Sequence, residues 1–246
     1  MKKVVYTCLT GNYDTLLQPL AIRDDWDYIC FSDCLSGNRA GVWQIRSIPN
    51  QCKDVILSSR FPKLLPHKVL PEYDWSVYHD ANMQIADEGF YEIISDHIEN
   101  GDKICQVPHP WRDCIYKEIA ECYRSGHFGY LKARAIRRHL LKDGFPAHYG
   151  LYENGLILRK HNDPDVIAAD RMWWELFHKG ARRDQLSLSY VYWKLGLKPA
   201  LLFGEGINAR NSSHINYYPH PARQVKQSVL SRKWNGFLRG QLSKYL

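Results

Sequence analysis

Residues that could bind an anionic ligand gather in one stretch of this 246-residue chain, residues 58–85. Its basic side chains come first, at Arg60, Lys63, His67 and Lys68. An apolar and aromatic run at 75–78 follows and leads into His79-Asp80-Ala81-Asn82. Open α/β sheets bind ligands at the carboxyl ends of their strands. A strand that ends in an acidic turn, with cations just upstream, therefore suits a diphosphate bound with or without a metal.

Asp80 and Asn82 are two positions apart at the end of this expected strand. Side chains at that spacing on an extended segment point the same way, so both oxygens can face one ligand. Carboxylate and amide oxygens suit Mg²⁺ or Mn²⁺. The alternative is an Asx-type turn in which both side chains bond the local backbone, and spacing alone slightly favours that turn.

Arg60 and Lys63 lie on a segment interrupted by Pro62 and Pro66. The two cations predict a clamp for a diphosphate, in which arginine offers two parallel hydrogen bonds. Ordinary surface charge is the alternative.

Histidine and cysteine spacing predicts no zinc site. The eleven histidines form no HExxH pattern, and the seven cysteines form no CxxC pair. The simplest interpretation is reduced thiols in a cytosolic protein, although Cys30 and Cys34 could form a bridge. His214 flanks an aromatic segment and is kept, with Asp80 and Asn82, as a candidate metal ligand.

Two loops that follow expected strands offer further binding groups. The first comprises Thr10, Gly11, Asn12, Tyr13 and Asp14. Its glycine turn lets backbone amides approach a nucleotide, and Asp14 could accept a hydrogen bond from a base or ribose; a plain turn is the alternative. The second loop is His109-Pro110-Trp111-Arg112, which could shape an acceptor or donor pocket or be a rigid proline loop with a packing tryptophan.

Two carboxylates are candidates for general acid or base catalysis. Asp184 precedes an expected helix, so capping that helix is its alternative role. Glu153 precedes an Asn154-Gly155 turn and could instead be a simple exposed charge.

The elements that must position these residues alternate between strands and helices. Strands are expected at 3–9, 27–33, 42–48, 74–79, 103–107 and 156–159. Helices are expected at 50–58, capped by Asn50, and at 88–99, 113–124, 130–141, 170–179 and 184–195. This alternation predicts an α/β sandwich built on a mainly parallel sheet.

The positive charge of the chain is unevenly placed. The net charge is +7, yet seven of the 33 Lys and Arg residues lie after Glu205, where no Asp or Glu occurs. Residues 1–205 are therefore neutral, and we expect a domain at 1–220 and a basic C-terminal tail at 221–246. Such a tail attracts nucleic acid or an anionic membrane surface.

Composition narrows the class of protein. The 45% apolar content supports a real core, and no signal peptide or run of about 18 apolar residues is visible. We therefore expect a cytoplasmic protein, peripheral at the inner membrane face if the tail binds lipid. Aromatic residues interleave with the basic ones near the C-terminus, which suits an interfacial helix.

Five segments together resemble a known family. They are residues 5–33 (VYTCLTGNYD…DWDYICFSD), 58–85, 109–122 (HPWRDCIYKEIAEC), 152–161 (YENGLILRKH) and 182–194 (RRDQLSLSYVYWK). In this order they resemble the glycosyltransferase-like domain of the plant TOD1/MUCI70 proteins and their bacterial relatives, over about residues 4–220. That group is similar to GT-A glycosyltransferases, and this chain looks like a bacterial member.

The resemblance implies a GT-A-like, Rossmann-related fold that binds a nucleotide-diphosphate sugar, with a UDP-sugar favoured. Asp80-Ala81-Asn82 then stands where GT-A enzymes carry Asp-x-Asp, which leaves the dependence on Mn²⁺ or Mg²⁺ open. The implied roles are base and ribose contacts for the loop 10–14 and Asp33, diphosphate contacts for Arg60 and Lys63, and a sugar-contacting or catalytic role for Asp184. His109, Arg112 and Gln185 would line the acceptor or sugar pocket.

The expected activity is transfer of a sugar to a glycan or lipid-linked acceptor in surface polysaccharide synthesis. A nucleic-acid-binding protein is the first alternative, but the neutral body argues against it. A lipid amide hydrolase, an activity attributed to one member of the family, is the second, and no hydrolase motif supports it.

Overall fold

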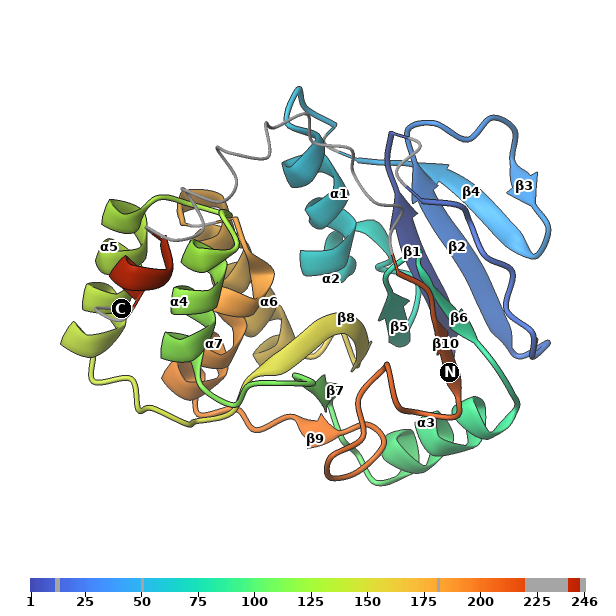
Figure 1. Cartoon of the computed structure of the whole chain (residues 1–246). Helices are drawn as coiled ribbons and strands as arrows, with labels where there is room; N and C mark the ends of the chain where they lie inside the picture. The colour runs from blue at the N-terminus through green and yellow to red at the C-terminus, as the bar shows by residue number, and fades with distance from the viewer. Residues whose placement is uncertain (12–13, 50, 181, 220–238, 244–246) are drawn as a thin grey trace.

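The computed structural model describes residues 1–11, 14–49, 51–180, 182–219 and 239–243 (Figure 1). Its main sheet has eight strands in the order β3-β4-β2-β1-β5-β8-β7-β9. They are β1 (Lys3–Leu9), β2 (Trp26–Ser32), β3 (Arg39–Ala40), β4 (Trp43–Ser47), β5 (Trp75–His79), β7 (Ile104–Pro108), β8 (Tyr152–Arg159) and β9 (Ala200–Leu201). A small sheet pairs β6 (Met83–Ile85) with β10 (Ile215–Tyr217).

Helices connect β4 to β5, β6 to β7, β7 to β8 and β8 to β9. They are α1 (Val55–Leu64), α2 (Pro66–Val69), α3 (Gly89–Glu99), α4 (Ile115–Arg124), α5 (Tyr130–Lys142), α6 (Pro164–Lys179), the 3₁₀ turn η1 (Asp184–Leu186) and α7 (Leu188–Leu195). The central strands β4, β2, β1 and β5 are parallel, and β8 runs antiparallel between β5 and β7. The expected α/β sandwich with a mainly parallel sheet is confirmed.

Alternating side chains of the buried strands supply the two faces of the sheet. Val5 and Val77 point to the face covered by α3, whereas Val4, Tyr6 and Tyr78 point to the opposite face. That opposite face is covered by α1 and α2 beside β1, and by α6 and α7 beside β8. Helices α4 and α5 form an outer layer against α7, so α4–α7 stand as one group beside the sheet (Figure 1).

The order of the strands reverses between β1 and β5. From β1 the chain proceeds to β2 and β4, and it then returns to β5 on the other side of β1. In open α/β sheets such a reversal opens a crevice at the carboxyl ends of the two strands, where ligands bind. Here β1 leads into the loop at Thr10 and β5 leads into Asp80.

The helix expected at 50–58 is shifted. Asp54, rather than Asn50, caps α1, because its carboxylate accepts hydrogen bonds from the backbone N–H groups of Ile56 and Leu57. Asn50 lies outside the described residues. The helix then continues through Pro62, and burial of apolar side chains such as Leu64 offsets the backbone hydrogen bond that proline cannot make.

Other boundaries also differ from expectation, and α6 begins at Pro164 rather than at residue 170. Asn154 and Gly155 lie inside β8 and do not form a turn. They fall where the pairing of β8 with β7 shifts register, and the Gly155 carbonyl accepts from the N–H of Asp80. The segment expected as one helix at 184–195 is split at Ser187 into η1 and α7.

The predicted tail at 221–246 lies mostly outside the described residues. Its described part, residues 239–243, is a short helical segment beside α4 (Figure 1). There Arg239 donates to the backbone carbonyl of Tyr123 over 2.8 Å. Among the described residues, no helix has both the length and the apolarity that a membrane crossing requires.

Candidate active site

Four charged side chains meet at the carboxyl end of β5, and we call them the ion cluster: Arg60, Lys63, Asp80 and Asp184. The Lys63 ammonium lies 2.8 Å from Asp184 Oδ2 and 3.4 Å from Asp80 Oδ1. Arg60 Nε lies 3.7 Å from the same Asp184 oxygen. Two cations and two carboxylates from three distant segments therefore form one charge-balanced group.

Buried contacts of Arg159 hold the ion cluster against the sheet. The Arg159 guanidinium on β8 donates to the backbone carbonyl of Lys63 over 2.6 Å and to the hydroxyl of Tyr6 over 2.8 Å. Its other end pairs with Asp170 of α6 at 2.8 Å. These contacts tie α1 to the sheet, so the position of Lys63 is set by the core.

The two cations of the expected diphosphate clamp, Arg60 and Lys63, differ in their exposure to solvent. The Lys63 side chain is 1% exposed and lies between the two carboxylates, whereas Arg60 is 32% exposed. Lys63 therefore orients Asp80 and Asp184, and Arg60 is the cation open to a ligand. The physical reason is that α1 continues past Pro62 and carries Lys63 inward with its buried face.

The two carboxylates of the ion cluster are held ionised. Burial alone would raise the pKa of Asp184, but Lys63 and Arg60 outweigh it and hold the pKa well below its ordinary value. The same balance of burial against Lys63 and Arg60 lowers the pKa of Asp80, helped by a 2.7 Å hydrogen bond from the hydroxyl of Tyr78.

Asp80 is placed by a close backbone approach. Its N–H donates to the carbonyl of Gly155 over 2.8 Å, and its own carbonyl accepts from Met83 over 2.9 Å. A Cβ atom on Gly155 would lie 2.4 Å from Met83 Cε and 3.0 Å from Asp80 Oδ2. A side chain at residue 155 would therefore force the end of the Met83 side chain and the Asp80 carboxylate to shift.

Asn82 is held in place by Tyr218, the residue that follows β10. Its side-chain amide donates to the carbonyl of Tyr218 over 2.7 Å, and Tyr218 N–H returns a bond to the Asn82 carbonyl. Asn82 Oδ1 is buried and has no hydrogen-bond partner among the described residues. Asp80 Oδ2 likewise takes part in none of the hydrogen bonds formed among them.

The loop after β1 meets the end of β2. Gly11 N–H donates to Asp33 Oδ1 over 2.9 Å, and Gly11 adopts a φ of 59°, a conformation that favours glycine. Thr10 is half-buried directly after β1. Asn12 and Tyr13 lie outside the described residues, and Asp14 follows them.

Glu153 is buried, which argues against the alternative that it is a simple exposed charge. It lies on β8, is 5% exposed, and its Oε1 lies 2.8 Å from an Arg210 guanidinium nitrogen. Its Oε2 is buried with no hydrogen-bond partner among the described residues. Burial raises the pKa of Glu153 above its ordinary value, against the lowering effects of Arg210 and Lys63 and together with the raising effect of Asp80.

The residues expected to line an acceptor pocket surround another buried carboxylate, Glu118 of α4. Arg112 Nε lies 2.5 Å from Glu118 Oε2, and His109 Nε2 lies 3.8 Å from the same oxygen. Burial lowers the pKa of His109. Gln185, beside Asp184, has a buried side-chain oxygen with no partner among the described residues.

His214 does not join Asp80 and Asn82. Its Nδ1 lies 2.7 Å from Asp87 Oδ1, and its backbone carbonyl bonds to Ala86 at the far end of β6. Because β10 runs antiparallel to β6, it is Tyr218 at the opposite end that reaches Asn82. The structure gives no basis for His214 as a ligand of the same metal.

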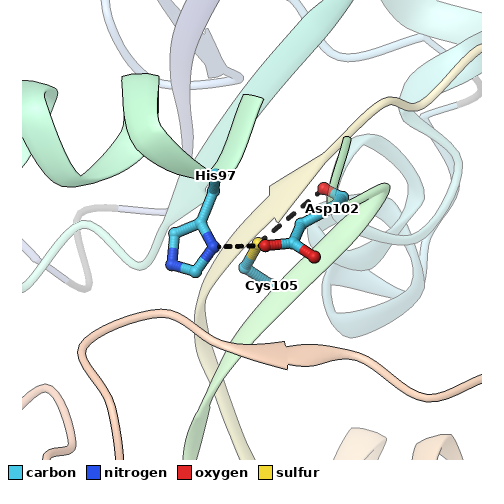
Figure 2. A group of neighbouring side chains, drawn as sticks. All are labelled: His97, Asp102 and Cys105. Atoms are coloured by element: carbon cyan, nitrogen blue, oxygen red, sulfur yellow. Dashed lines mark hydrogen bonds and ion pairs between the residues drawn. The ribbon is translucent and has the colours of Figure 1, made fainter. Parts of the chain in front are cut away.

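A second group of potential metal ligands lies at the opposite edge of the sheet. His97, Asp102 and Cys105 have ligand atoms within 4.8 Å of one another (Figure 2). His97 Nδ1 contacts Asp102 at 2.8 Å, His97 Nε2 contacts the Leu202 carbonyl at 3.1 Å, and the Cys105 thiol bonds the Asp102 carbonyl at 3.8 Å. Burial raises the pKa of the Cys105 thiol, which disfavours the thiolate that a metal needs. These groups satisfy one another, and all seven cysteines are free.

Sequence reasoning missed two residues of the site, Arg210 and Tyr217. The guanidinium carbon of Arg210 lies 3.9 Å from the Tyr217 ring centre and 4.9 Å from that of Trp111. Arg210 counted only as one of the seven basic residues that follow Glu205. The Asn208-x-Arg210-Asn211 pattern was an available signal, because Asn208 accepts from Arg210 N–H and Asn211 accepts from Asn208 N–H.

Solved glycosyltransferase structures resemble this fold. The galactosyltransferase LgtC in complex with donor and acceptor sugar analogs gives a TM-score of 0.48 and 11% identity over 99% of this chain and 96% of that one. The WbbM bifunctional glycosyltransferase gives 0.44 and 11% over 80% of this chain, which spans 38% of WbbM. Mouse xyloside xylosyltransferase 1 gives 0.42 and 10% over 78% of this chain and 80% of that one.

Comparison of the sequence with protein families and with curated proteins identifies the family of the chain. No curated protein sequence matches the chain. The family described as TOD1/MUCI70, glycosyltransferase-like domain, matches residues 32–204. This range is narrower than the expected 4–220, but it contains Asp33, Glu153 and all of the ion cluster, and leaves out Gly11 and Arg210. Because the match spans more than half of its length, the chain belongs to the TOD1/MUCI70 glycosyltransferase-like domain family.

Proposed function

We propose that this protein is a glycosyltransferase that moves a sugar from a nucleotide-diphosphate sugar to a glycan or lipid-linked acceptor. The observation that carries the proposal is the ion cluster, which lies at the reversal of strand order between β1 and β5. Family membership supports the same class of activity. A UDP-sugar is the favoured donor.

The donor would lie along the ends of β2, β1 and β5. Gly11 and Asp33, joined by a 2.9 Å hydrogen bond, are the proposed base and ribose contacts, together with the rest of the loop 10–14. Arg60 is the proposed diphosphate contact, because its planar guanidinium can donate two parallel hydrogen bonds and its side chain is partly exposed. Lys63 supports it indirectly by holding Asp80 and Asp184.

The carboxylates suit two different roles. Asp184, held ionised by two cations, is a poor proton acceptor and fits an electrostatic or sugar-contacting role. Glu153 has a raised pKa and an oxygen without a partner, both of which favour a general base.

In the proposed reaction, Glu153 and Arg60 act on the acceptor hydroxyl and on the leaving diphosphate, respectively. Glu153 accepts the proton of an acceptor hydroxyl, whose oxygen forms a bond to the anomeric carbon of the donor. The bond from that carbon to the diphosphate oxygen breaks, and the nucleoside diphosphate leaves with the electron pair. Arg60 stabilises the negative charge that develops on the leaving group.

A divalent cation fits the oxygen donors present. Asp80 Oδ2 and the buried Asn82 Oδ1 lack hydrogen bonds from the described residues, and hard oxygen atoms are what Mg²⁺ and Mn²⁺ prefer. We therefore assign Asp80 and Asn82 as the residues that would hold the metal. Such an ion neutralises diphosphate charge when bound.

Thermal stability in the presence of nucleotide sugars tests the proposal. UDP-, GDP- and dTDP-sugars are screened with and without Mn²⁺, and a CMP-sugar serves as the control that lacks a diphosphate. We expect at least one diphosphate sugar to raise the melting temperature, because a ligand that binds only the folded state stabilises it. If no nucleotide sugar does so, the transferase proposal fails.

A further inference from the structure

An arginine held between two aromatic rings lies next to the ion cluster. Arg210 contacts the rings of Tyr217 at 3.9 Å and Trp111 at 4.9 Å, and it is fixed to Glu153 at 2.8 Å. Tyr217 pairs with Met83, three residues after Asp80. We call Trp111, Arg210 and Tyr217 the aromatic platform.

Hydrogen bonds fix the backbone at Trp111, and its side chain remains open to solvent. The N–H groups of Trp111 and Arg112 both donate to His109 Nδ1, at 3.3 and 3.1 Å, and His109 N–H donates to the Leu151 carbonyl. Even so, Trp111 is 67% exposed. An exposed indole on a fixed backbone, in contact with His109 and Arg210, is suited to ligand contact, because less conformational entropy is lost on binding.

The aromatic platform lies on the far side of Glu153 from the proposed nucleotide contacts. Along this edge of the sheet, Asp33 follows β2, Gly11 follows β1, Asp80 follows β5, Glu153 lies on β8 and Trp111 follows β7. Neighbouring strands are about 4.8 Å apart, so β2 and β7 are roughly 19 Å apart. A nucleotide held by Gly11 and Asp33 would therefore leave Trp111 free for another ligand.

Glu153 connects this surface to the proposed chemistry. Its Oε1 is occupied by Arg210, while Oε2 is buried and has no partner among the described residues. A hydroxyl group is the kind of donor that this oxygen lacks. Sugar rings present C–H faces that pack on the electron-rich faces of aromatic rings, and their hydroxyls need polar groups at the edge.

We propose that the aromatic platform is the acceptor subsite, where Trp111 packs against a pyranose ring and Glu153 Oε2 receives one hydroxyl of that sugar. This inference rests on the proposed transferase function and deepens it. The occupant is a sugar ring, and Arg210 is a positioning residue that holds both Glu153 and the rings.

Direct binding of simple sugars tests the subsite. The probes are the methyl glycosides of glucose, galactose, mannose and xylose at millimolar concentration, and UDP is added in a separate arm. The indole N–H resonance of Trp111, assigned with Trp111→Phe, is followed by NMR in the full chain. We expect at least one glycoside to shift this resonance. Binding of that glycoside to Trp111→Ala, followed through backbone amide resonances, should be about two- to tenfold weaker than binding to the wild type.

The controls separate the subsite from the transferase proposal. Leu131→Ala removes another exposed apolar side chain, on α5, and should leave glycoside binding unchanged. Trp111→Ala should leave UDP binding unchanged. The subsite is contradicted if no glycoside shifts the resonance, if Trp111→Ala binds glycosides as tightly as the wild type, or if UDP alone moves the resonance. Retained UDP binding in these cases would leave the transferase proposal standing.

Discussion

The proposed site has a donor half, formed by the ion cluster, and an acceptor half, formed by Glu153 and the aromatic platform. The two halves differ in the charged groups that surround their carboxylates. In the donor half, Asp184 and Asp80 share two cations, one of them fully buried, and the ammonium of Lys63 lies over the ring of Tyr78. In the acceptor half, Glu153 has one arginine close by, and aromatic rings flank that arginine. Carboxylates therefore lie near two cations in the donor half and near a single arginine in the acceptor half.

This difference separates a permanent anion from a proton acceptor. Lys63 and Arg60 overcome the effect of burial on Asp184 and lower its pKa, whereas burial prevails at Glu153 and raises its pKa. Carboxylates whose environments push their pKa values apart commonly take different catalytic roles. The comparison predicts that changes in the donor half affect nucleotide binding, and that changes in the acceptor half affect proton transfer.

The largest effect is expected from Asp80→Ala. Loss of this carboxylate removes a proposed metal ligand and one partner of Lys63, and turnover should fall by about 10³-fold, as for other groups that stabilise a leaving group. Release of nucleoside diphosphate from the donor found in the screen measures it. Asp96→Ala, on α3, is the control, and an Asp80→Ala enzyme as active as the wild type would remove Asp80 from the site.

Lys63→Met should cause the largest loss of stability. It leaves Asp80 and Asp184 without their shared buried partner, which costs about 3–5 kcal/mol in comparable buried pairs. Urea unfolding measures the change, and Lys68→Met, at an exposed position on α2, should change stability by less than about 0.5 kcal/mol. Equal effects of the two substitutions would show that the ion cluster contributes no special stability.

The ion cluster also predicts how stability depends on pH. Asp80 and Asp184 have lowered pKa values when folded, so their contribution is present above the ordinary aspartate pKa of about 3.9 and is lost as pH falls below it. Lys63→Met should reduce this acid-dependent loss. Unfolding curves between neutral and acidic pH test it, and an unchanged pH dependence in the variant would contradict it.

How much of this could be predicted from sequence depended on whether contacts were local. The strands at 3–9 and 74–79 followed from patterns within a few residues. The pairing of Lys63 with Asp184 spans 121 positions, and no local pattern indicates it. The burial of Glu153 was missed because Asn154-Gly155 resembles a turn, whereas its glycine serves a close contact with Asp80.

Gly155→Ala should weaken activity more than stability. The added Cβ would press on Met83 and Asp80 Oδ2, and displacement of Asp80 should lower turnover by about 10²-fold. Overpacking of this kind costs about 1–3 kcal/mol of stability. Gly129→Ala is the matched control, because nothing lies near its Cβ position. Turnover at the wild-type rate would mean that Asp80 does not need this placement.

A smaller, pH-dependent effect is expected from Arg210→Gln. A base works when deprotonated, so turnover should fall as pH drops through the raised pKa of Glu153. Loss of Arg210 removes a lowering charge, leaves Lys63 and Asp80 as the other charged neighbours, and should move this acidic limb to higher pH. Arg210→Lys keeps the charge and should restore the wild-type profile. A profile that does not move would leave Arg210 with a structural role only.

Calorimetric titration with nucleoside diphosphates tests the central claim most directly. UDP, GDP and dTDP are titrated, with and without Mn²⁺, into the wild type and into Arg60→Gln. We predict that at least one binds the wild type, and that Arg60→Gln weakens it by about 10- to 100-fold, as expected for loss of a hydrogen bond to a charged group. Absence of binding by all three, or equal affinity in the two proteins, would contradict a diphosphate site at the ion cluster.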